Sequence, residues 1–302
     1  MSTLPRPHRP DLAHLPCLPP LGAALLVRAL FKRPAPLADA PVAASYRLER
    51  IDIGHVRRYN RAFGFPGDAV TLTYLYLLAQ RAQLATMVAH PIPFRIPGLI
   101  HVENRLAMHG PAVPDAPLVL ETALRLLPVT ASGALHCMLE TRAFDGARLA
   151  FSCDSTYLVK RGGRSGHPGP PDAPPSGQPI GSWRVGPDCG RRYAALSGDW
   201  NPIHLWPWSA RLMGMRAPII HGAHTLARAC ALLGTHSGRD SAALWCRFRR
   251  PVPLGSEVAL FLDTADGDDR FAAVSNGRVV IEGGYDVTAW PGPAAAATPA
   301  AG

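Results

Sequence analysis

The residues best suited to chemistry form one dense polar segment, Ser197-Gly198-Asp199-Trp200-Asn201-Pro202-Ile203-His204. Apolar residues surround it, so Asp199 and His204 are expected to be at least partly buried. Proline fixes its own φ and keeps the preceding residue out of the α region, so Asn201-Pro202 forces a turn between them. Such a turn can bring the carboxylate and the imidazole to one point, where they would form an acid/base pair that shares one water.

A second segment, Pro218-Ile-Ile-His-Gly-Ala-His224, opens an apolar stretch that is typical of a buried helix. Gly222 then offers a backbone N–H at the positive end of the helix dipole, which suits a carbonyl that gains negative charge. An acid/base pair and a carbonyl-polarising amide are together what addition of water across a conjugated thioester requires.

Other chemistries fit these residues less well. His221 and His224 raise the question of zinc together with His204, but no Asp, Glu or Cys nearby completes a typical ligand set, so we expect no metal. We interpret His221 as structural, and no cofactor is expected. Ser197 lacks the G-x-S-x-G context of a hydrolase nucleophile, so a serine hydrolase triad is disfavoured.

The elements that must position these residues follow an α+β pattern that is repeated in the two halves of the chain. In each half a buried helix precedes an antiparallel series of strands, with hairpin turns expected at Asp145-Gly146 and Asn276-Gly277. In the first half, helices are expected over Ile51–Phe63 and Thr71–Val88, and strands over Leu99–Met108, Leu118–Pro128, Ala134–Phe144 and Arg148–Val159. In the second half, a turn segment over Gly190–Trp208 precedes helices over Ser209–Met215 and Gly222–Leu233 and strands over Ala243–Arg249, Glu257–Thr264, Phe271–Asn276 and Arg278–Val287.

Composition divides the chain further. We expect an irregular lead-in over residues 1–42, a first domain over 43–162, a linker over 163–180, a second domain over 181–290 and a loose tail over 291–302. The linker is rich in proline and glycine and lacks apolar side chains to bury. Within the lead-in, Leu21–Phe31 is too short for a membrane span and reads as an amphipathic helix docked on the body.

Overall composition excludes several classes of protein. Hydrophobic residues make up 47% and charged residues 18% of the 302 residues, a profile of a globular chain. The net charge of +9 is carried almost wholly by arginine, and it suits a phosphorylated ligand better than nucleic acid because no long basic run occurs. Six scattered cysteines without a C-x-x-C pair favour reduced thiols in the cytoplasm.

Residues 190–233 resemble the MaoC-like dehydratase family, which includes the (R)-specific enoyl-CoA hydratases. The resemblance rests on Ser-Gly-Asp-x-Asn-Pro-(hydrophobic)-His, matched by residues 197–204, and on a later His-Gly, matched by His221-Gly222. Phe94–Asn104 is also similar to the N-terminal half of such proteins. The resemblance implies a double hotdog, in which each of two long helices is wrapped by an antiparallel sheet, with a catalytic second domain and a non-catalytic first domain.

By the same resemblance, Asp199 and His204 match the catalytic pair, and Gly222 matches the residue whose amide forms the oxyanion hole. A serine eight residues after that glycine lies near the catalytic water in some members, and Cys230 stands there in this chain. Substrate contacts are expected from Ser197, Asn201, Cys230 and Trp206.

The implied reaction is hydration of a trans-2-enoyl-CoA to an (R)-3-hydroxyacyl-CoA, or the reverse dehydration. The substrate would be an acyl-CoA thioester or its acyl-carrier-protein counterpart, with no nucleic-acid partner and no stable membrane insertion. The chain would act as a monomer with an internal pseudo-dimer or as a homodimer. A hotdog thioesterase and a catalytically silent acyl-CoA-binding protein stay as alternatives.

Overall fold

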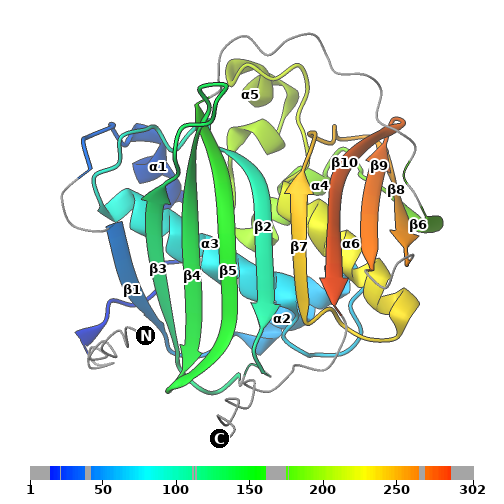
Figure 1. Cartoon of the computed structure of the whole chain (residues 1–302), viewed down its shortest axis with the longest axis horizontal. Coiled ribbons are helices and arrows are strands. Elements are labelled where there is room, and N and C mark those ends of the chain that lie inside the picture. Colours follow the sequence, from blue (N-terminus) through cyan, green and yellow to red (C-terminus); the bar gives the residue numbers. More distant parts are fainter. Residues whose placement is uncertain are drawn as a thin grey trace, which may run out of the picture.

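The computed structural model describes residues 14–20, 22–37, 42–110, 112, 114–160, 175, 177–264 and 269–286. These residues form one ten-stranded antiparallel sheet that curves around two long helices, α3 and α6 (Figure 1). The strand order is β1-β3-β4-β5-β2-β7-β10-β9-β8-β6. Each half of the chain therefore contributes five neighbouring strands and one central helix.

The first half builds its hotdog around α3, whose sequence is apolar on nearly every side and is buried over most of its length. Thr71 caps α3 by accepting the Tyr74 N–H at 3.4 Å, and Asp52 caps α2 in the same way. The elements are α1 (Ala23–Phe31), β1 (Val42–Leu48), α2 (Ile53–Phe63), α3 (Leu72–Ala89), β2 (Ile100–Met108), β3 (Leu118–Leu126), β4 (Leu135–Asp145) and β5 (Arg148–Lys160).

The second half repeats this arrangement around α6. Its hairpin turn places Asn276 and Gly277 at φ of 50° and 68°, the left-handed pair that a two-residue turn of this kind requires. The elements are β6 (Gln178–Arg184), α4 (Cys189–Ser197), the short 3₁₀ helix η2 (Pro202–His204), α5 (Pro207–Leu212), α6 (Gly222–Ser237), β7 (Ala243–Phe248), β8 (Glu257–Asp263), β9 (Arg270–Ser275) and β10 (Arg278–Asp286).

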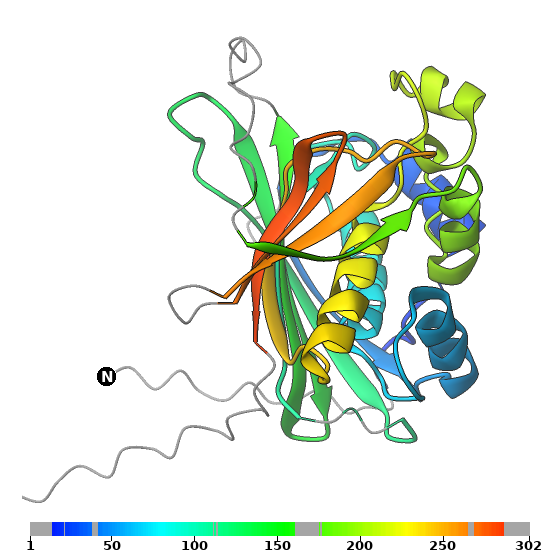
Figure 2. The ribbon, with the colours of Figure 1, turned by 90° about the vertical axis from the view of Figure 1, so that its right-hand side faces the viewer.

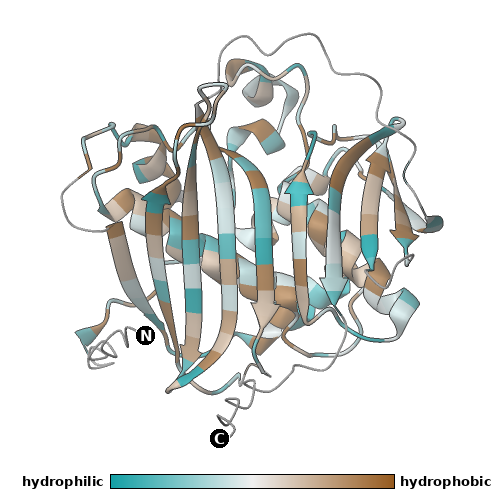
Figure 3. Ribbon diagram, viewed as in Figure 1, coloured by the Kyte–Doolittle hydropathy of each residue, from teal (hydrophilic) through white to brown (hydrophobic). Residues whose placement is uncertain are grey.

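The two halves meet where β2 pairs with β7, with Asn104 opposite Cys246. Buried and partly exposed residues alternate along strands such as β4, so one sheet face packs on the helices and the other is more polar (Figure 3). The smaller helices α1, α2, α4 and α5 lie on the side of α3 and α6 that is away from the sheet (Figure 2). Two layers of helix thus stand against one layer of sheet.

Most predicted helices and strands are confirmed within a few residues, but three elements were not expected. Helix α4 occupies the start of the predicted turn segment, and β6 begins at Gln178, inside the predicted linker. Strand β1 begins at Val42, the last residue of the predicted lead-in. Elements this short show only a weak hydrophobic periodicity, and their secondary structure is determined by tertiary contacts.

Helix α1 docks on the body as predicted, through Leu25 and Ala29 against Val88. The start of the lead-in, most of the linker and the tail over 291–302 lie outside the described residues. Among the described helices, none is long and apolar enough to cross a membrane.

Candidate active site

The polar segment forms a tight loop between α4 and η2, held by its own side chains. Gly198 ends α4 in the left-handed region at φ 80°. The Ser197 hydroxyl donates to the Tyr193 carbonyl at 2.8 Å and accepts the Asp199 N–H at 3.2 Å. The Asn201 N–H donates to Asp199 Oδ1 at 3.1 Å. The hydroxyl of the serine and the backbone of the asparagine therefore fix where the aspartate side chain points.

Asn201 and Pro202 start η2, as the sequence predicted for a turn at this step. The Asn201 side chain accepts the Ile203 N–H at 3.4 Å, and proline occupies the first position of the short helix. Gly190 of α4 packs directly against this turn. A Cβ atom at position 190 would overlap the His204 carbonyl oxygen. Only glycine at this position lets α4 support the turn that carries His204.

His204 is buried and held in one tautomer. Its Nδ1 lies 2.9 Å from the Ile219 carbonyl oxygen, and a carbonyl can only accept, so Nδ1 carries the proton. Nε2 is left with a free lone pair. Burial lowers the pKa of His204 below its ordinary value of 6.5, although the Asp199 charge and the bond to Ile219 oppose this shift. The imidazole is therefore a neutral acceptor at physiological pH.

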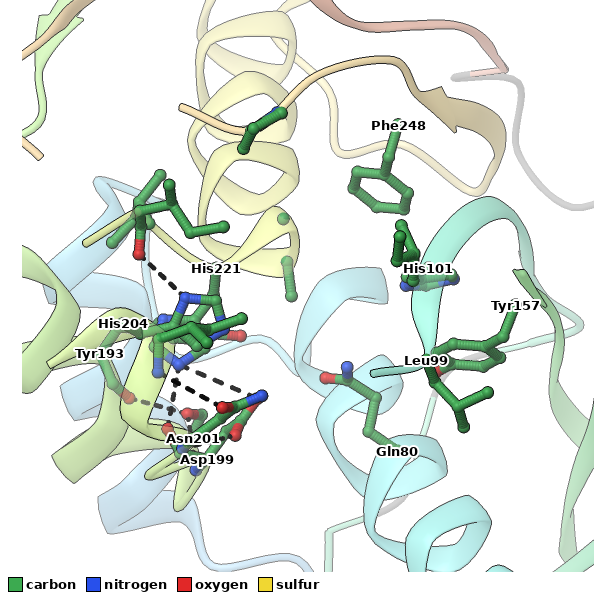
Figure 4. Close-up of a pocket in the computed structure, with 18 of the residues that line it drawn as sticks. Gln80, Leu99, His101, Tyr157, Tyr193, Asp199, Asn201, His204, His221 and Phe248 are labelled. Atoms are coloured by element: carbon green, nitrogen blue, oxygen red, sulfur yellow. Dashed lines mark hydrogen bonds and ion pairs between the residues drawn. The ribbon is translucent and has the colours of Figure 1, made fainter. Parts of the chain in front are cut away.

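Asp199, His204 and His221 converge on one point, with one carboxylate oxygen or ring nitrogen from each lying within 4.8 Å of the others (Figure 4). His221 Nε2 donates to the Asp199 backbone carbonyl at 2.9 Å and lies 3.8 Å from Asp199 Oδ2. The His204 and His221 rings stack with their centroids 3.6 Å apart. His221, expected to be structural, thus braces both members of the pair.

This cluster corrects one step of the sequence reasoning about metals, since Asp199 does supply a carboxylate beside His204 and His221. The three residues nevertheless fit a metal poorly. The His221 nitrogen nearest the carboxylate uses its proton for the Asp199 carbonyl and so has no lone pair to offer. Zinc needs a lone pair from each ligand.

Gly222 begins α6 beside this cluster. Among the described residues its N–H donates to no other group, as is usual at the first turn of a helix. A Cβ atom at Gly222 would lie 2.8 Å from Phe248 Cε1, closer than real contacts allow. Gly222 lines the same space as Asp199 and His204.

That space is a cavity of about 530 Å³, lined by residues from both halves of the chain. Figure 4 shows the Asp199 and His204 cluster on one side and residues of the first half, including Gln80, His101 and Tyr157, on the other. The remainder of the wall is largely apolar and reaches α1; it includes Leu26, Ala29, Leu30, Leu84, Met87, Ile96 and Leu99.

The predicted site residues divide into two groups. Asp199, His204, Gly222, Ser197 and Asn201 line the cavity. The other two predicted contacts, Cys230 and Trp206, do not, and this corrects the expectation for them.

Cys230 packs in the core, and burial raises the pKa of its thiol to about 12. Eight residues of helix advance about 80° beyond two full turns, so Cys230 leaves the face that carries Gly222. Trp206 instead stacks on Trp208, with the ring centroids 6.0 Å apart, and does not line the cavity.

Several lining residues were missed. The hydroxyls of Tyr193 and Thr225 are buried without a partner among the described residues, and both residues line the cavity. His101 was expected to share a strand face with Glu103. A β-bulge between them instead turns His101 to the cavity, whereas Glu103 pairs with Arg247 at 2.7 Å. The Phe94–Asn104 resemblance was the available signal for this wall.

Two hotdogs that share one cavity make this a double-hotdog protein, and the cavity is lined by a carboxylate, a neutral imidazole and the glycine that starts α6. Comparison with known proteins identifies the family. The MaoC like domain model matches residues 173–283. The chain is 34% identical over 224 residues to 3-hydroxyacyl-thioester dehydratase X of Mycobacterium tuberculosis, covering 72% of this chain and 78% of that protein. The chain therefore belongs to the MaoC-like dehydratase family, as the motif predicted.

Other relatives agree with this placement. The (R)-specific enoyl-CoA hydratase of Aeromonas caviae is 35% identical over 96 residues, which cover 30% of this chain and 72% of that protein. The crystal structure of HtdX from Mycobacterium tuberculosis superposes with a TM-score of 0.67 at 26% identity, covering 81% of this chain and all of that chain. The α+β double-hotdog prediction is thereby confirmed.

Proposed function

We propose that this protein adds water to a trans-2-enoyl thioester to give an (R)-3-hydroxyacyl thioester, or runs the reverse dehydration, through Asp199 and His204. The observation that carries the proposal is the convergence of the Asp199 carboxylate and the His204 Nε2 lone pair in one cavity, beside the open Gly222 amide. The relatives named as a dehydratase and as an (R)-specific hydratase support the reaction and its stereochemistry.

In the proposed mechanism, one water bridges Asp199 and His204. Nε2 of His204 takes a proton from this water as its oxygen bonds to C3 of the enoyl group. The electron pair of the double bond moves toward the thioester oxygen, which accepts a hydrogen bond from the Gly222 N–H. Protonated His204 then gives this proton to C2, so that one water is consumed and both side chains return to their starting protonation states.

We assign the roles of the two halves accordingly. The second half, over 181–290, supplies the reacting groups, and the first half, over 43–162, supplies the far wall of the cavity for the acyl chain. The carrier is a CoA thioester or its acyl-carrier-protein counterpart. The named relatives include a hydroxyacyl-thioester dehydratase and an enoyl-CoA hydratase, which supports the thioester class.

Incubation of the purified protein with crotonyl-CoA tests the reaction. The proposal expects enoyl absorbance to fall without release of free thiol, and chiral analysis to find the (R)-3-hydroxy product. Thiol release would instead indicate a thioesterase, and binding without turnover would indicate a silent acyl-CoA-binding protein. Either of these outcomes, or an (S) product, contradicts the proposal.

The pH dependence of kcat/KM follows from the state of His204. Burial lowers the pKa of His204, so the imidazole stays neutral at neutral pH. It becomes protonated only at pH values below the ordinary histidine pKa of 6.5. A base is lost on protonation, so kcat/KM should hold its neutral value down to about pH 6.5 and decline only at lower pH. A midpoint at or above that value in a pH–rate profile would contradict the proposed base.

The acyl-chain preference should depend on α1, because Leu26 is half-buried and lines the cavity. Leu26→Trp narrows this end of the cavity. We expect kcat/KM for dodecenoyl-CoA to fall about tenfold or more, with crotonyl-CoA nearly unaffected, because only the longer chain reaches α1. The matched control is Ala24→Trp on the exposed side of the same helix. Equal losses on both substrates, or the same effect in the control, would place the acyl chain elsewhere.

A further inference from the structure

The exposed large hydrophobic side chains of this protein are concentrated around the cavity. Eleven occur among the described residues, and ten of them belong to three segments, 22–37, 90–101 and 200–217. The first segment holds four, the second one and the third five. They are Val27, Leu30, Phe31, Leu37, Ile100, Trp200, Trp206, Trp208, Leu212 and Met213. Val129, in the connection between β3 and β4, is the eleventh.

These three segments surround one opening. Each contributes lining residues, and Leu30, Ile100 and Trp200 are at once exposed and part of the cavity wall. They therefore form the rim at which the cavity meets solvent. Helices α1 and α5, which carry most of the other exposed apolar side chains, lie on the same side of the molecule (Figure 2). An exposed apolar surface of this kind marks an interaction site rather than a random scatter.

The charges on the same three segments have one sign. The segments contain Arg28, Lys32, Arg33, Arg95, Arg211 and Arg216, and their sequences include no aspartate or glutamate. The three segments themselves therefore carry only positive charge, and the neighbouring acidic group is the Asp199 carboxylate of the cavity wall. Segments that bind at the membrane interface typically combine tryptophan, phenylalanine and leucine with arginine and lysine.

We propose that this rim docks the protein on an anionic lipid bilayer, with the opening of the cavity toward the membrane surface. The most exposed of these ten hydrophobic residues, Phe31 at 79% and Leu212 at 78%, belong to two separate helices. A fluid bilayer accepts such exposed side chains without a complementary pocket. A second copy of this chain fits less well, because a two-fold contact would bring six cations against six cations.

Vesicle flotation of the full-length protein tests this docking. We expect the protein to float with vesicles that contain about one third phosphatidylglycerol and to stay behind with pure phosphatidylcholine. Phe31→Ser combined with Leu212→Ser should lower the partition coefficient about tenfold or more. The control Val129→Ser removes the one exposed large hydrophobic side chain that lies outside the rim among the described residues, and this variant should bind like the wild type.

Crotonyl-CoA turnover measured in parallel keeps this test separate from the proposed reaction. None of Phe31, Leu212 and Val129 lines the cavity, so all variants should hydrate this substrate at the wild-type rate. Docking is overturned if the wild type binds neither vesicle, if it binds both equally, or if the double variant floats like the wild type. It is equally overturned if the double variant instead dissociates a dimer or abolishes binding of an acidic acyl-carrier protein while vesicles are not bound.

Discussion

Replacing Asp199 with asparagine should lower kcat for crotonyl-CoA hydration by about 100- to 10,000-fold, the range typical of lost acid–base catalysis. The amide has nearly the shape of the carboxylate but carries no charge, so it can neither accept a proton nor favour protonated His204. The fold should be unaffected, because the amide oxygen can still accept the Asn201 N–H that holds the loop. Steady-state kinetics together with a thermal unfolding curve measures both effects.

Asp188→Asn is the matched control for this substitution. Asp188 precedes α4 and forms an exposed ion pair with Arg192 at 3.2 Å, outside the cavity. The Asp188→Asn variant should keep the wild-type rate within about twofold, because exposed ion pairs of this kind contribute little to stability. If Asp199→Asn retained more than about a tenth of the wild-type rate, the assignment of this carboxylate to the reaction would be wrong.

Gly222→Pro should lower kcat about 100- to 1,000-fold relative to Gly222→Ala, the cost typical of one lost oxyanion donor. Proline removes the N–H, and alanine keeps it. The backbone tolerates proline here, because it is the first residue of α6 and His221 before it has ψ 137°. Both variants place a Cβ atom against Phe248, so their difference isolates the amide.

Both rates are measured on crotonyl-CoA, with circular dichroism to compare helix content. Gly222→Ala alone should already be slower than the wild type, because Phe248 lines the cavity and must shift. Equal kcat values for the alanine and proline variants would mean that the amide does not stabilise the thioester oxygen. The role proposed for the start of α6 would then be withdrawn.

The sequence predicted the reacting side of the site well because its information is local. The turn at Asn201-Pro202 and the glycine that opens α6 act over a few residues, so the local sequence allowed a turn that brings Asp199 and His204 together. The same locality explains the accurate hairpin at Asn276-Gly277. Side chains whose position depends on one turn can be placed from the order of residues.

The opposite wall depends on contacts between distant segments and could not be placed in this way. His101 reaches the cavity because β2 pairs with β7 and because a bulge precedes Glu103. Neither the pairing of β2 with β7 nor the bulge can be predicted from the residues of one short segment. The prediction for Cys230 was wrong for a different reason, since eight residues of helix carry it about 80° away from the face of Gly222 and into the core.

The tautomer of His204 also lay beyond the sequence, because it follows from a carbonyl 15 residues away. Its effect on mechanism is large, since only the Nδ1-protonated ring can present a lone pair to water in the cavity. His221 was expected to be structural, and its bond to the Asp199 carbonyl specifies what it holds in place.

The central claim is that Asp199 and His204 act as one unit on one water. A double-mutant cycle measures this directly, with kcat/KM for crotonyl-CoA determined for the wild type, Asp199→Asn, His204→Gln and the double variant. Groups that act as a unit give losses that do not multiply, so the double variant should be about as slow as the slower single variant. Losses that multiply would show two independent contributions and would contradict the shared water.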